Sequence, residues 1–318
     1  MVLGGTGAIG GAAAARLAGH GWRVQVTGRE PARMPPDLAM LGVTFHAVDR
    51  ADTHAIEALV GEGVDLLVDA LAFCSDDVRA LIPVMSAAGS VVLVSSRAVY
   101  ADQRGRHVNG PEAPVFDGPI REDQRTVPAA GDGTDPFSRA GYGPSKVAAE
   151  RTALDSGLPV TVLRPAKVHG PWARNPRTAV IARRMLAGAP AIALADRGAS
   201  IDHLTASANA AALIEAVANA PGPRILNIAD PDTPTAAEIV SAIATELRWD
   251  GLVDLLEPGE PGGEHPWHTS HPIVLDITAA LEIGYRPVNQ GIALLAEEVR
   301  WFAADHASTE THQLKARP

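Results

Sequence analysis

The stretch Gly4-Gly-Thr-Gly7-Ala-Ile-Gly10 decides the fold of this 318-residue chain. Val2 and Leu3 precede it, and an alanine-rich helical pattern from about Ala8 to Ala18 follows it. Glycines at this spacing let the backbone approach a pyrophosphate, which then lies at a helix N-terminus among free N–H groups. The stretch therefore predicts a dinucleotide-binding turn. A central strand usually has about five residues, so either the first strand is very short or the true start lies upstream.

Short apolar runs alternate with helical patterns through the first 165 residues, which is the signature of a parallel doubly wound sheet. These runs lack in/out alternation, as expected for strands covered on both faces. The predicted strands are Trp22–Thr27, Val43–Val48, Val64–Ala70, Ser90–Ser95 and Pro159–Leu163.

The pattern changes after Pro165. Helices are expected at Thr178–Leu186, Ala206–Ala218, Ala236–Leu247 and Gln290–Phe302, with a strand at Arg224–Ile228, a loop over residues 256–272 and a frayed last dozen residues. The expected fold class is α/β, a Rossmann-type doubly wound parallel sheet with a smaller C-terminal α/β substrate lobe. Residues 1–165 form the dinucleotide-binding domain, joined by the strand near 224–229, and residues 166–318 form mainly the substrate-binding lobe.

Composition excludes several function classes. The net charge of −10 argues against a nucleic-acid partner, because phosphate binding needs a basic stripe. The chain contains no run of 18 or more apolar residues, so the sequence predicts no membrane-spanning helix. Because the chain starts almost directly in the glycine turn, we expect no signal peptide and a cytoplasmic location. Cys74 is the single cysteine, which excludes an internal disulfide and fits a reducing compartment.

Tyr142 and Lys146 lie four residues apart at the start of a predicted helix. This spacing points both side chains along one helix face. An ammonium beside a phenol favours the phenolate, and a phenol with a lowered pKa can exchange a proton with a carbonyl or an alcohol. The pair therefore predicts an acid–base device.

Together these motifs resemble the extended short-chain dehydrogenase/reductase family, in its NAD-dependent epimerase/dehydratase group. The resemblance covers nearly the whole chain. It rests on Gly4, Gly7 and Gly10 (G-x-x-G-x-x-G), on Ser95-Ser-Arg-Ala-Val-Tyr100 (S-S-x-x-V-Y), on Tyr142 and Lys146 (Y-x-x-x-K), on Leu163-Arg-Pro-Ala-Lys-Val-His-Gly-Pro171 (L-R-P-x-x-V-Y-G-P), and on the ending from Leu281 to Trp301.

The resemblance assigns roles to individual residues. It implies that Ser96 binds the substrate oxygen, that Tyr142 transfers the proton, and that Lys146 lowers the tyrosine pKa and holds the nicotinamide ribose. The implied cofactor-binding residues are Gly4, Thr6, Gly7, Ala8, Ile9, Gly10, Arg29, Asp49, Ala70, Leu71, Lys146 and Pro165. The substrate candidates are Lys167, His169 and Arg197.

The choice of cofactor is predicted from the end of the second strand. NAD enzymes place a carboxylate there, whereas an arginine accommodates the 2′-phosphate of NADP. Gly28 stands at the acidic position, Arg29 follows it, and Glu30 comes two residues late. These residues favour NADP(H) over NAD(H).

Departures from the family narrow the substrate and the reaction. Dehydratases of this group have Asp-Glu after the catalytic threonine, where this chain has Arg97-Ala98, so dehydration is not expected. Lys167 replaces an asparagine that helps hold the diphosphate, and Ile201 replaces the arginine that grips it. Lys167 or Arg197 could substitute for these groups, but nucleotide-sugar binding is in doubt.

Two further segments leave alternatives open. The long irregular stretch between Tyr100 and Tyr142 is either an active-site flap or a disordered insertion. His265, His268 and His271 do not match a zinc spacing, so no metal site is expected and the loop is read as solvated or as lobe surface.

The leading hypothesis is an NAD(P)-dependent oxidoreductase that transfers a hydride between nicotinamide and a carbonyl/alcohol of a small polar metabolite, with Tyr142 as acid/base. The alternative is an NAD-dependent epimerase of a sugar or sugar nucleotide. A non-catalytic NAD(P)-binding sensor is the third hypothesis. Family resemblance also implies a homodimer.

Overall fold

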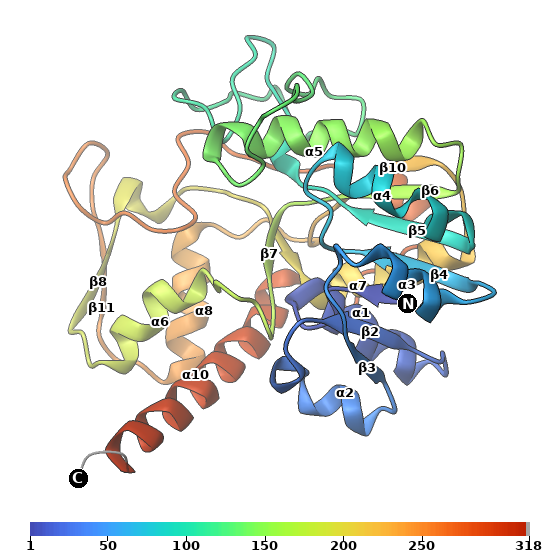
Figure 1. Cartoon of the computed structure of the whole chain (residues 1–318). Helices are drawn as coiled ribbons and strands as arrows, with labels where there is room; N and C mark the ends of the chain where they lie inside the picture. The colour runs from blue at the N-terminus through green and yellow to red at the C-terminus, as the bar shows by residue number, and fades with distance from the viewer. Residues whose placement is uncertain (316–318) are drawn as a thin grey trace.

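The computed structural model describes residues 1–315, with side chains described up to residue 305. Seven parallel strands form the central sheet, and the prediction of a Rossmann-type doubly wound fold is confirmed (Figure 1). The strand order is β10 (Arg224–Ile228), β6 (Val160–Pro165), β5 (Ala88–Val94), β4 (Val64–Asp69), β1 (Val2–Leu3), β2 (Gln25–Gly28) and β3 (Thr44–Ala47).

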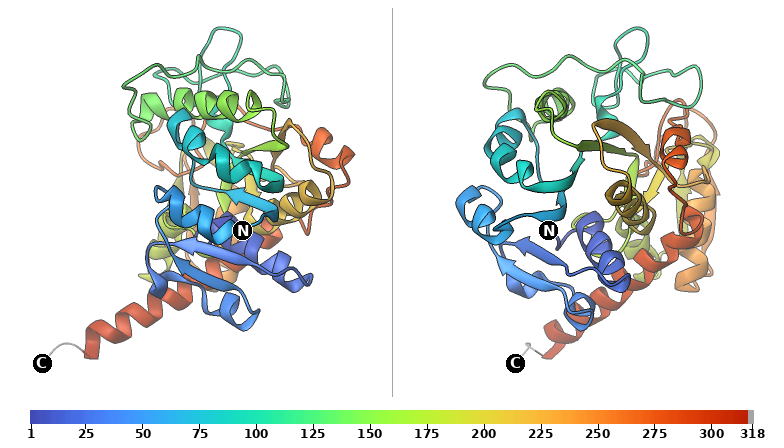
Figure 2. Two further views of the ribbon diagram at one scale, coloured as in Figure 1. Left: turned by 45° about the vertical axis from the view of Figure 1, so that its right-hand side comes forward. Right: turned by 90° about the vertical axis from the view of Figure 1, so that its right-hand side faces the viewer.

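Helices cover both faces of this sheet (Figure 2). On one face lie α1 (Ala8–Gly19) and α7 (Ser207–Asn219), which pack against each other. On the other lie α3 (Thr53–Val60), α4 (Ser75–Ser86) and α5 (Arg139–Leu154). Each face of the sheet has its own apolar core, and successive residues of a strand point to opposite cores. In β5, for example, Val92 packs in the core beneath α1 and α7, and Leu93 packs in the core beneath α3, α4 and α5. Both faces are buried, which explains the continuous apolar runs.

The first strand spans Val2–Leu3 and pairs on both sides. Val2 pairs with Val26 on one side and with Val68 on the other, and Leu3 continues both registers. This pairing places the glycine turn that follows Leu3 at the centre of the sheet.

The second lobe has its own core, built by α6 (Thr178–Leu186), α8 (Ala236–Leu247) and the start of α10 (Gly291–Lys315). Two small parallel sheets accompany it: β8 (Ala191–Leu194) with β11 (Leu252–Leu255), and β7 (Lys167–His169) with β9 (Leu204–Ala206). The remaining short elements are η1 (Pro31–Arg33), α2 (Pro36–Met40), η2 (Arg97–Val99), η3 (Ala195–Gly198) and α9 (Thr278–Glu282). No described helix is both long enough and apolar enough to cross a bilayer.

The end of the last helix was predicted wrongly. The apolar periodicity stops at Phe302, yet α10 runs to Lys315. Good helix formers such as Ala303, Ala304 and Glu310 follow Phe302, so helix propensity allows the helix to continue where the packing pattern ends.

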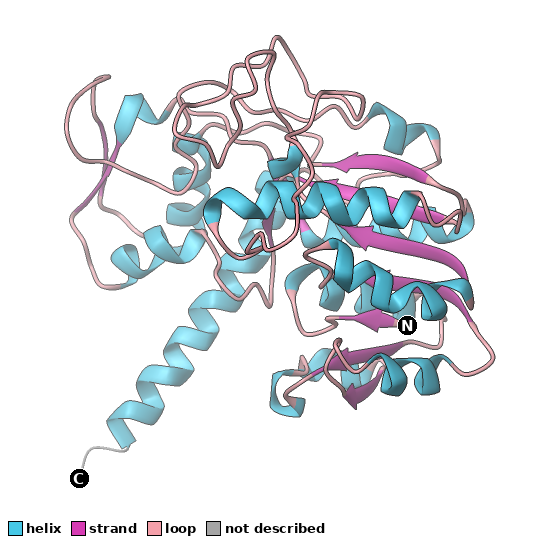
Figure 3. Cartoon of the chain, turned by 45° about the horizontal axis from the view of Figure 1, so that its top comes forward, coloured by secondary structure: helices cyan, strands magenta, loops and turns pink. Residues whose placement is uncertain are grey.

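The irregular segment 101–138 is folded onto the protein. Tyr100 bridges to Thr126, and Ile120 bridges to Leu275. Ile120 and Val127 are buried in a shared apolar cluster with Val147 of α5. Figure 3 shows such irregular segments gathered beside the sheet. The segment is therefore anchored at several points, and its outer part is free to line a cavity.

Candidate active site

A cavity of about 760 Å³ lies at the carboxyl ends of β1, β2, β4, β5 and β6. This volume is typical of a small-molecule site, and the position is the one at which doubly wound sheets bind dinucleotides. Every residue predicted to bind the cofactor lines it: Gly4, Thr6, Gly7, Ala8, Ile9, Gly10, Arg29, Asp49, Ala70, Leu71, Lys146 and Pro165.

The glycines of the turn have distinct physical roles. Gly4 has a φ of +88°, which disfavours any residue with a side chain. A Cβ at Gly10 would lie 2.3 Å from the carbonyl oxygen of Gly4, so helix α1 could not pack so close to the turn. At Gly7 the nearest atom to an added Cβ is 3.7 Å away, which leaves the space over the helix N-terminus open. The turn thus forms a cradle that fits a dinucleotide phosphate.

The end of β2 is tightly packed at the position where a carboxylate usually stands. A Cβ on Gly28 would lie 3.1 Å from both Phe45 and Thr6. Arg29 is exposed and lines the cavity. Glu30 is bound by Arg33, at 2.7 Å between Oε2 and Nε. Arg29 is therefore the charged side chain that β2 presents at this edge of the cavity.

Arg50 is a cavity residue that the sequence analysis missed. Its guanidinium is buried against Asp69 at the end of β4, with 2.5 Å between Nη2 and Oδ2. Asp69 also accepts a hydrogen bond from the backbone N–H of Leu71. This ion pair fixes the loop after β4. A basic residue directly after Asp49 was the only signal in the sequence.

Local features of α5 bring Tyr142 to Ser96. The Ser138 side chain caps the helix by accepting a hydrogen bond from the Gly141 N–H, at 3.0 Å. An added Cβ at Gly143 would lie 2.7 Å from the Ala98 carbonyl oxygen, so glycine is required for α5 to approach the turn after β5. Ser96 Oγ accepts a hydrogen bond from the Ala98 N–H, which leaves its own hydrogen free to be donated to the Tyr142 oxygen.

The prediction that Lys146 lowers the pKa of Tyr142 is wrong for this arrangement. Burial raises the pKa of Tyr142 above its usual value, while the hydrogen bond from Ser96 and the charge of Arg177 lower it in part. The Lys146 ammonium donates to the carbonyl oxygens of Ala72, at 2.6 Å, and Val94, at 3.0 Å. Those bonds hold it 5.8 Å from the centre of the tyrosine ring.

Lys146 is itself perturbed. Burial lowers its pKa to about 8, although the nearby carboxylates of Asp69, Glu150 and Asp77 oppose this shift. Its Nζ also lies 4.6 Å from the centre of the Phe73 ring, a distance at which a cation is attracted to an aromatic face. Lys146 is therefore fixed at the floor of the cofactor cavity.

A second cavity, of about 620 Å³, adjoins the first. Ser96, Tyr142, Ala166 and Arg177 line both cavities. The rest of the second cavity comes from residues 108–114 of the irregular segment, from residues 268–271 of the loop after β11, and from Arg97, Ala98, Arg139, Lys167, Asp202 and Ile273. The flap interpretation of the irregular segment therefore fits the structure better than a disordered insertion.

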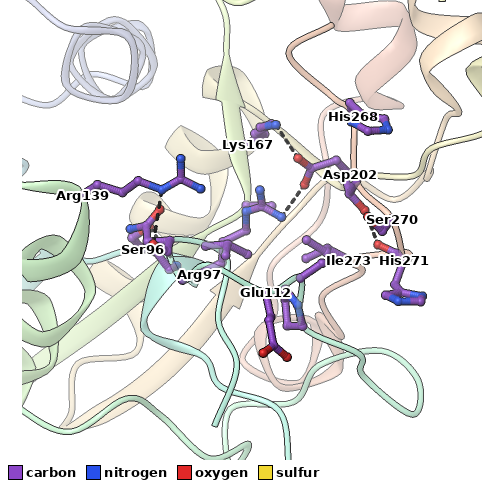
Figure 4. Close-up of a pocket in the computed structure, with 18 of the residues that line it drawn as sticks. Ser96, Arg97, Glu112, Arg139, Lys167, Asp202, His268, Ser270, His271 and Ile273 are labelled. Carbon is purple, nitrogen blue, oxygen red and sulfur yellow. Dashed lines mark hydrogen bonds and ion pairs between the residues drawn. The ribbon is translucent and has the colours of Figure 1, made fainter. Parts of the chain in front are cut away.

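Asp202 organises the second cavity (Figure 4). It forms ion pairs with Arg97 and with Lys167, and Lys167 also donates to the Pro266 carbonyl oxygen. Asp202 is 2% exposed. Burial lowers the pKa of Lys167, as does the charge of Arg97, while Asp202 raises it. One carboxylate thus holds two cations in the cavity wall.

Of the three substrate candidates, Lys167 lines the second cavity, and His169 and Arg197 line neither of these two cavities. His169 is buried, and its ring contacts Asp230 with 3.0 Å between Nε2 and Oδ2. Arg197 is exposed and pairs with Glu257 at 3.3 Å. The structure does not bring His169 or Arg197 to the site. Arg177, which the sequence analysis missed, stands at the N-cap of α6 and lines both cavities.

The histidine loop is not simply solvated. His265 is 7% exposed and Trp267 is 1% exposed, whereas His268 is exposed and contacts Asp196 at 2.7 Å. Burial, with the neighbouring charges of His268 and Lys167, lowers the pKa of His265 to about 4. Among residues 1–305, no group of three or more His, Cys, Asp or Glu side chains is arranged to hold a metal ion.

Comparison with known proteins agrees with this geometry. Residues 1–229 match the model of the NAD dependent epimerase/dehydratase family. No curated protein matches the chain.

Similar folds occur among solved structures of three sugar-nucleotide enzymes. UDP-glucose-4-epimerase from Stenotrophomonas maltophila, with bound NAD and formylated UDP-arabinopyranose, has a TM-score of 0.73 at 17% identity, covering 96% of this chain and 98% of that one. UDP-N-acetylglucosamine 4-epimerase from Methanobrevibacter ruminantium M1, in complex with UDP-N-acetylmuramic acid, has a TM-score of 0.71 at 19% identity, covering 96% and 97%. dTDP-glucose 4,6-dehydratase from Bacillus anthracis, in complex with NAD, has a TM-score of 0.69 at 16% identity, covering 96% of each chain.

Proposed function

The chain belongs to the NAD dependent epimerase/dehydratase family, and from this we propose that it is an NADP(H)-dependent reductase or dehydrogenase. Its substrate is a small polar metabolite with a carbonyl or an alcohol at the reacting carbon. The family membership makes it an enzyme of the short-chain dehydrogenase/reductase type, and the proposal concerns the cofactor choice and the net reaction.

One observation carries the proposal: Ser96 and Tyr142 line both cavities. An oxygen bound between these two hydroxyls lies at the junction of a dinucleotide cavity and a second cavity. Bound nicotinamide supplies or accepts a hydride there. The proton must come from the protein, because hydride addition to a carbonyl carbon leaves a negative charge on the oxygen.

The protonation state of Tyr142 suits it to donate a proton. Since burial raises its pKa, the tyrosine is a neutral phenol near neutral pH and can act as the acid. Its hydroxyl donates the proton to the carbonyl oxygen while Ser96 donates a hydrogen bond to the same oxygen. The cation of Arg177 then stabilises the tyrosinate that remains.

The end of β2 supports NADP(H). A 2′-phosphate needs a cation, and Arg29 lines the cavity at this edge, while Gly28 places no carboxylate there to repel the phosphate. Arg33 is engaged with Glu30, so this carboxylate is neutralised rather than free to repel a phosphate. The cavity residues Lys146 and Asp49 suit the nicotinamide ribose and the adenine, as the family resemblance implies.

The alternative function is epimerisation with tightly held NAD. It is favoured by the similar structures of UDP-sugar epimerases, and it uses the same serine, tyrosine and lysine. Two residues argue against epimerisation with NAD. Gly28 stands where NAD enzymes have a carboxylate for the ribose, and Lys167 stands where nucleotide-sugar enzymes of the family have an asparagine. We further propose a cytoplasmic homodimer in which α5 takes part, on family resemblance alone.

The test is a pair of fluorescence titrations of the purified protein, with NADPH and with NADH. NADPH binding that is tighter by tenfold or more, followed by net NADPH oxidation with carbonyl substrates, is the expected result. Preference for NAD(H), co-purification of that cofactor and epimerisation without net cofactor change would establish the alternative. Cofactor binding with no turnover of either kind would leave only the sensor hypothesis.

A further inference from the structure

We propose that the substrate carries a carboxylate or phosphate group within a few bonds of the reacting carbonyl, and that Arg177 binds this group. This inference rests on the proposed function and specifies its substrate class. The substrate is thus a small anionic oxo compound rather than a nucleotide sugar, in which the diphosphate lies far from the reacting carbon.

The second cavity is cationic in an acidic protein. Arg97, Arg139, Lys167 and Arg177 line it, against only Glu112 and Asp202. The chain as a whole carries a net charge of −10, so this local excess of positive charge runs against the average. A cleft of one sign concentrates ligands of the opposite sign.

The four cations are not equally available. Arg97 and Lys167 share Asp202. Arg139 uses its Nε on the Asn109 carbonyl oxygen, at 3.2 Å. Arg177 has only a long contact of 3.5 Å from Nη1 to the Val168 carbonyl oxygen. The charges of Asp202 and Glu298 act on Arg177, but Asp202 is held in ion pairs by Arg97 and Lys167 and Glu298 accepts a hydrogen bond from Thr178. Arg177 is therefore the guanidinium most free to bind a ligand.

Arg177 also lies at the reacting centre. It lines both cavities together with Tyr142, and its charge acts on the tyrosine phenol. An anion bound in bidentate fashion by this guanidinium would hold the next carbons of the same molecule beside Tyr142 and Ser96. The anionic group and the carbonyl must then be close together in the substrate.

The remaining lining argues against a nucleoside. No Phe or Trp lines this cavity, and its rings are those of Tyr142, His268 and His271. Tyr142 is engaged at the reacting centre, so the small histidine rings are all that a base would have to stack on. The non-polar part of the wall comes from small or compact residues, among them Val108, Pro111, Pro114 and Ile273. These surfaces suit a short hydrocarbon portion.

The experiment uses the full-length protein saturated with NADPH and three probes: oxamate, which places a carboxylate beside a carbonyl, inorganic phosphate, and UDP. Calorimetry should show binding of oxamate, of phosphate, or of both, and the stronger of the two identifies the anionic group. Arg177→Ala should weaken that binding roughly tenfold or more, whereas Arg177→Lys should retain part of it.

Arg184→Ala is the matched control, because Arg184 is an exposed arginine of the same helix that lines neither cavity. Unchanged anion binding by Arg177→Ala with a normal melting temperature would overturn the inference. So would binding of UDP without binding of either small anion, or binding of none of the three. The preceding NADPH titration tests the proposed function separately, since NADPH binding without anion binding refutes the substrate class alone.

Discussion

The two cavities that meet at Tyr142 are built in different ways. The cofactor cavity is formed by strand ends and by a glycine turn in which neighbouring residues contact one another. The substrate cavity is formed by segments far apart in the chain, residues 108–114 and 268–271, which are held by ion pairs around Asp202. The first is shaped by backbone sterics and the second by side-chain electrostatics.

This difference separates what each cavity can tolerate. A backbone cradle depends on a few glycines and is insensitive to most side-chain changes. The stability of a cavity wall that is built from shared ion pairs depends on each charged side chain, because the loss of one buried partner leaves the remaining charges uncompensated. Substitutions should therefore affect cofactor binding and substrate-side stability independently.

The largest effect is expected where the cavities meet. Tyr142→Phe removes the proton donor and keeps the ring that packs near Phe73. Turnover should fall on the order of 10²–10⁴-fold, measured as NADPH oxidation with a reducible carbonyl substrate. Affinity for NADPH should stay nearly constant, because only the hydroxyl is lost. Normal activity of this variant would refute the role of Tyr142.

The next largest effect is expected in the substrate wall. Asp202→Asn leaves Arg97 and Lys167 crowded together without their shared carboxylate. Removing one partner of a buried pair costs about 3–5 kcal/mol, so urea denaturation should show a free energy of unfolding lower by about that amount. Asp254→Asn, at an exposed position of β11, is the control and should change little. Equal stability of the two variants would mean that the ion pairs do not hold the wall.

The residues predicted to bind the cofactor line one cavity because the sequence signals for them are local. A glycine spacing, a strand end and a helix start lie within a few residues of each other, so Gly4, Gly10 and Arg29 could be placed without knowledge of the tertiary fold. The apolar runs gave the central strands within a few residues for the same reason. The predicted helix Ala236–Leu247 likewise matches the bounds of α8.

The sequence could not predict the substrate cavity to the same extent. Irregular segments carry no periodicity, and their placement depends on distant contacts such as the bridge from Ile120 to Leu275. Arg177 lies just before a predicted helix, but nothing local shows that this helix end faces Tyr142. The pKa of Tyr142 was mispredicted for a related reason. Helix spacing fixes the position of the Lys146 backbone, but the hydrogen bond to the Ala72 carbonyl oxygen fixes the position of its ammonium group.

Lys146 allows the cofactor side to be tested through pH. Its folded pKa of about 8 lies below the ordinary 10.5 because of burial. Between these pH values the unfolded chain binds more protons, so this group makes the protein more stable as pH rises from about 8 to 10.5, by up to about 3 kcal/mol. Below pH 8 Lys146 is protonated in both the folded and the unfolded state, so the free-energy cost of burying its charge does not change with pH. The free-energy difference between wild type and Lys146→Met, measured by urea denaturation, should shift in favour of wild type across that range, and a pH-independent difference would contradict the buried, charged lysine.

The smallest effect distinguishes two cofactors that differ by one phosphate. Arg29→Ala should weaken NADPH binding by about 1.5–3 kcal/mol, the contribution of a hydrogen bond to a charged group, and leave NADH binding unchanged because NADH offers a hydroxyl at that position. Arg79→Ala, an exposed arginine of α4 paired with Asp76, controls for the loss of one positive charge from the surface. If Arg29→Ala weakens both cofactors equally, the arginine acts on the shared part of the dinucleotide. If only NADPH binding is affected, a side chain rather than the backbone cradle sets cofactor specificity. Side-chain charge then matters in both cavities, and they differ only in how much of their binding depends on it.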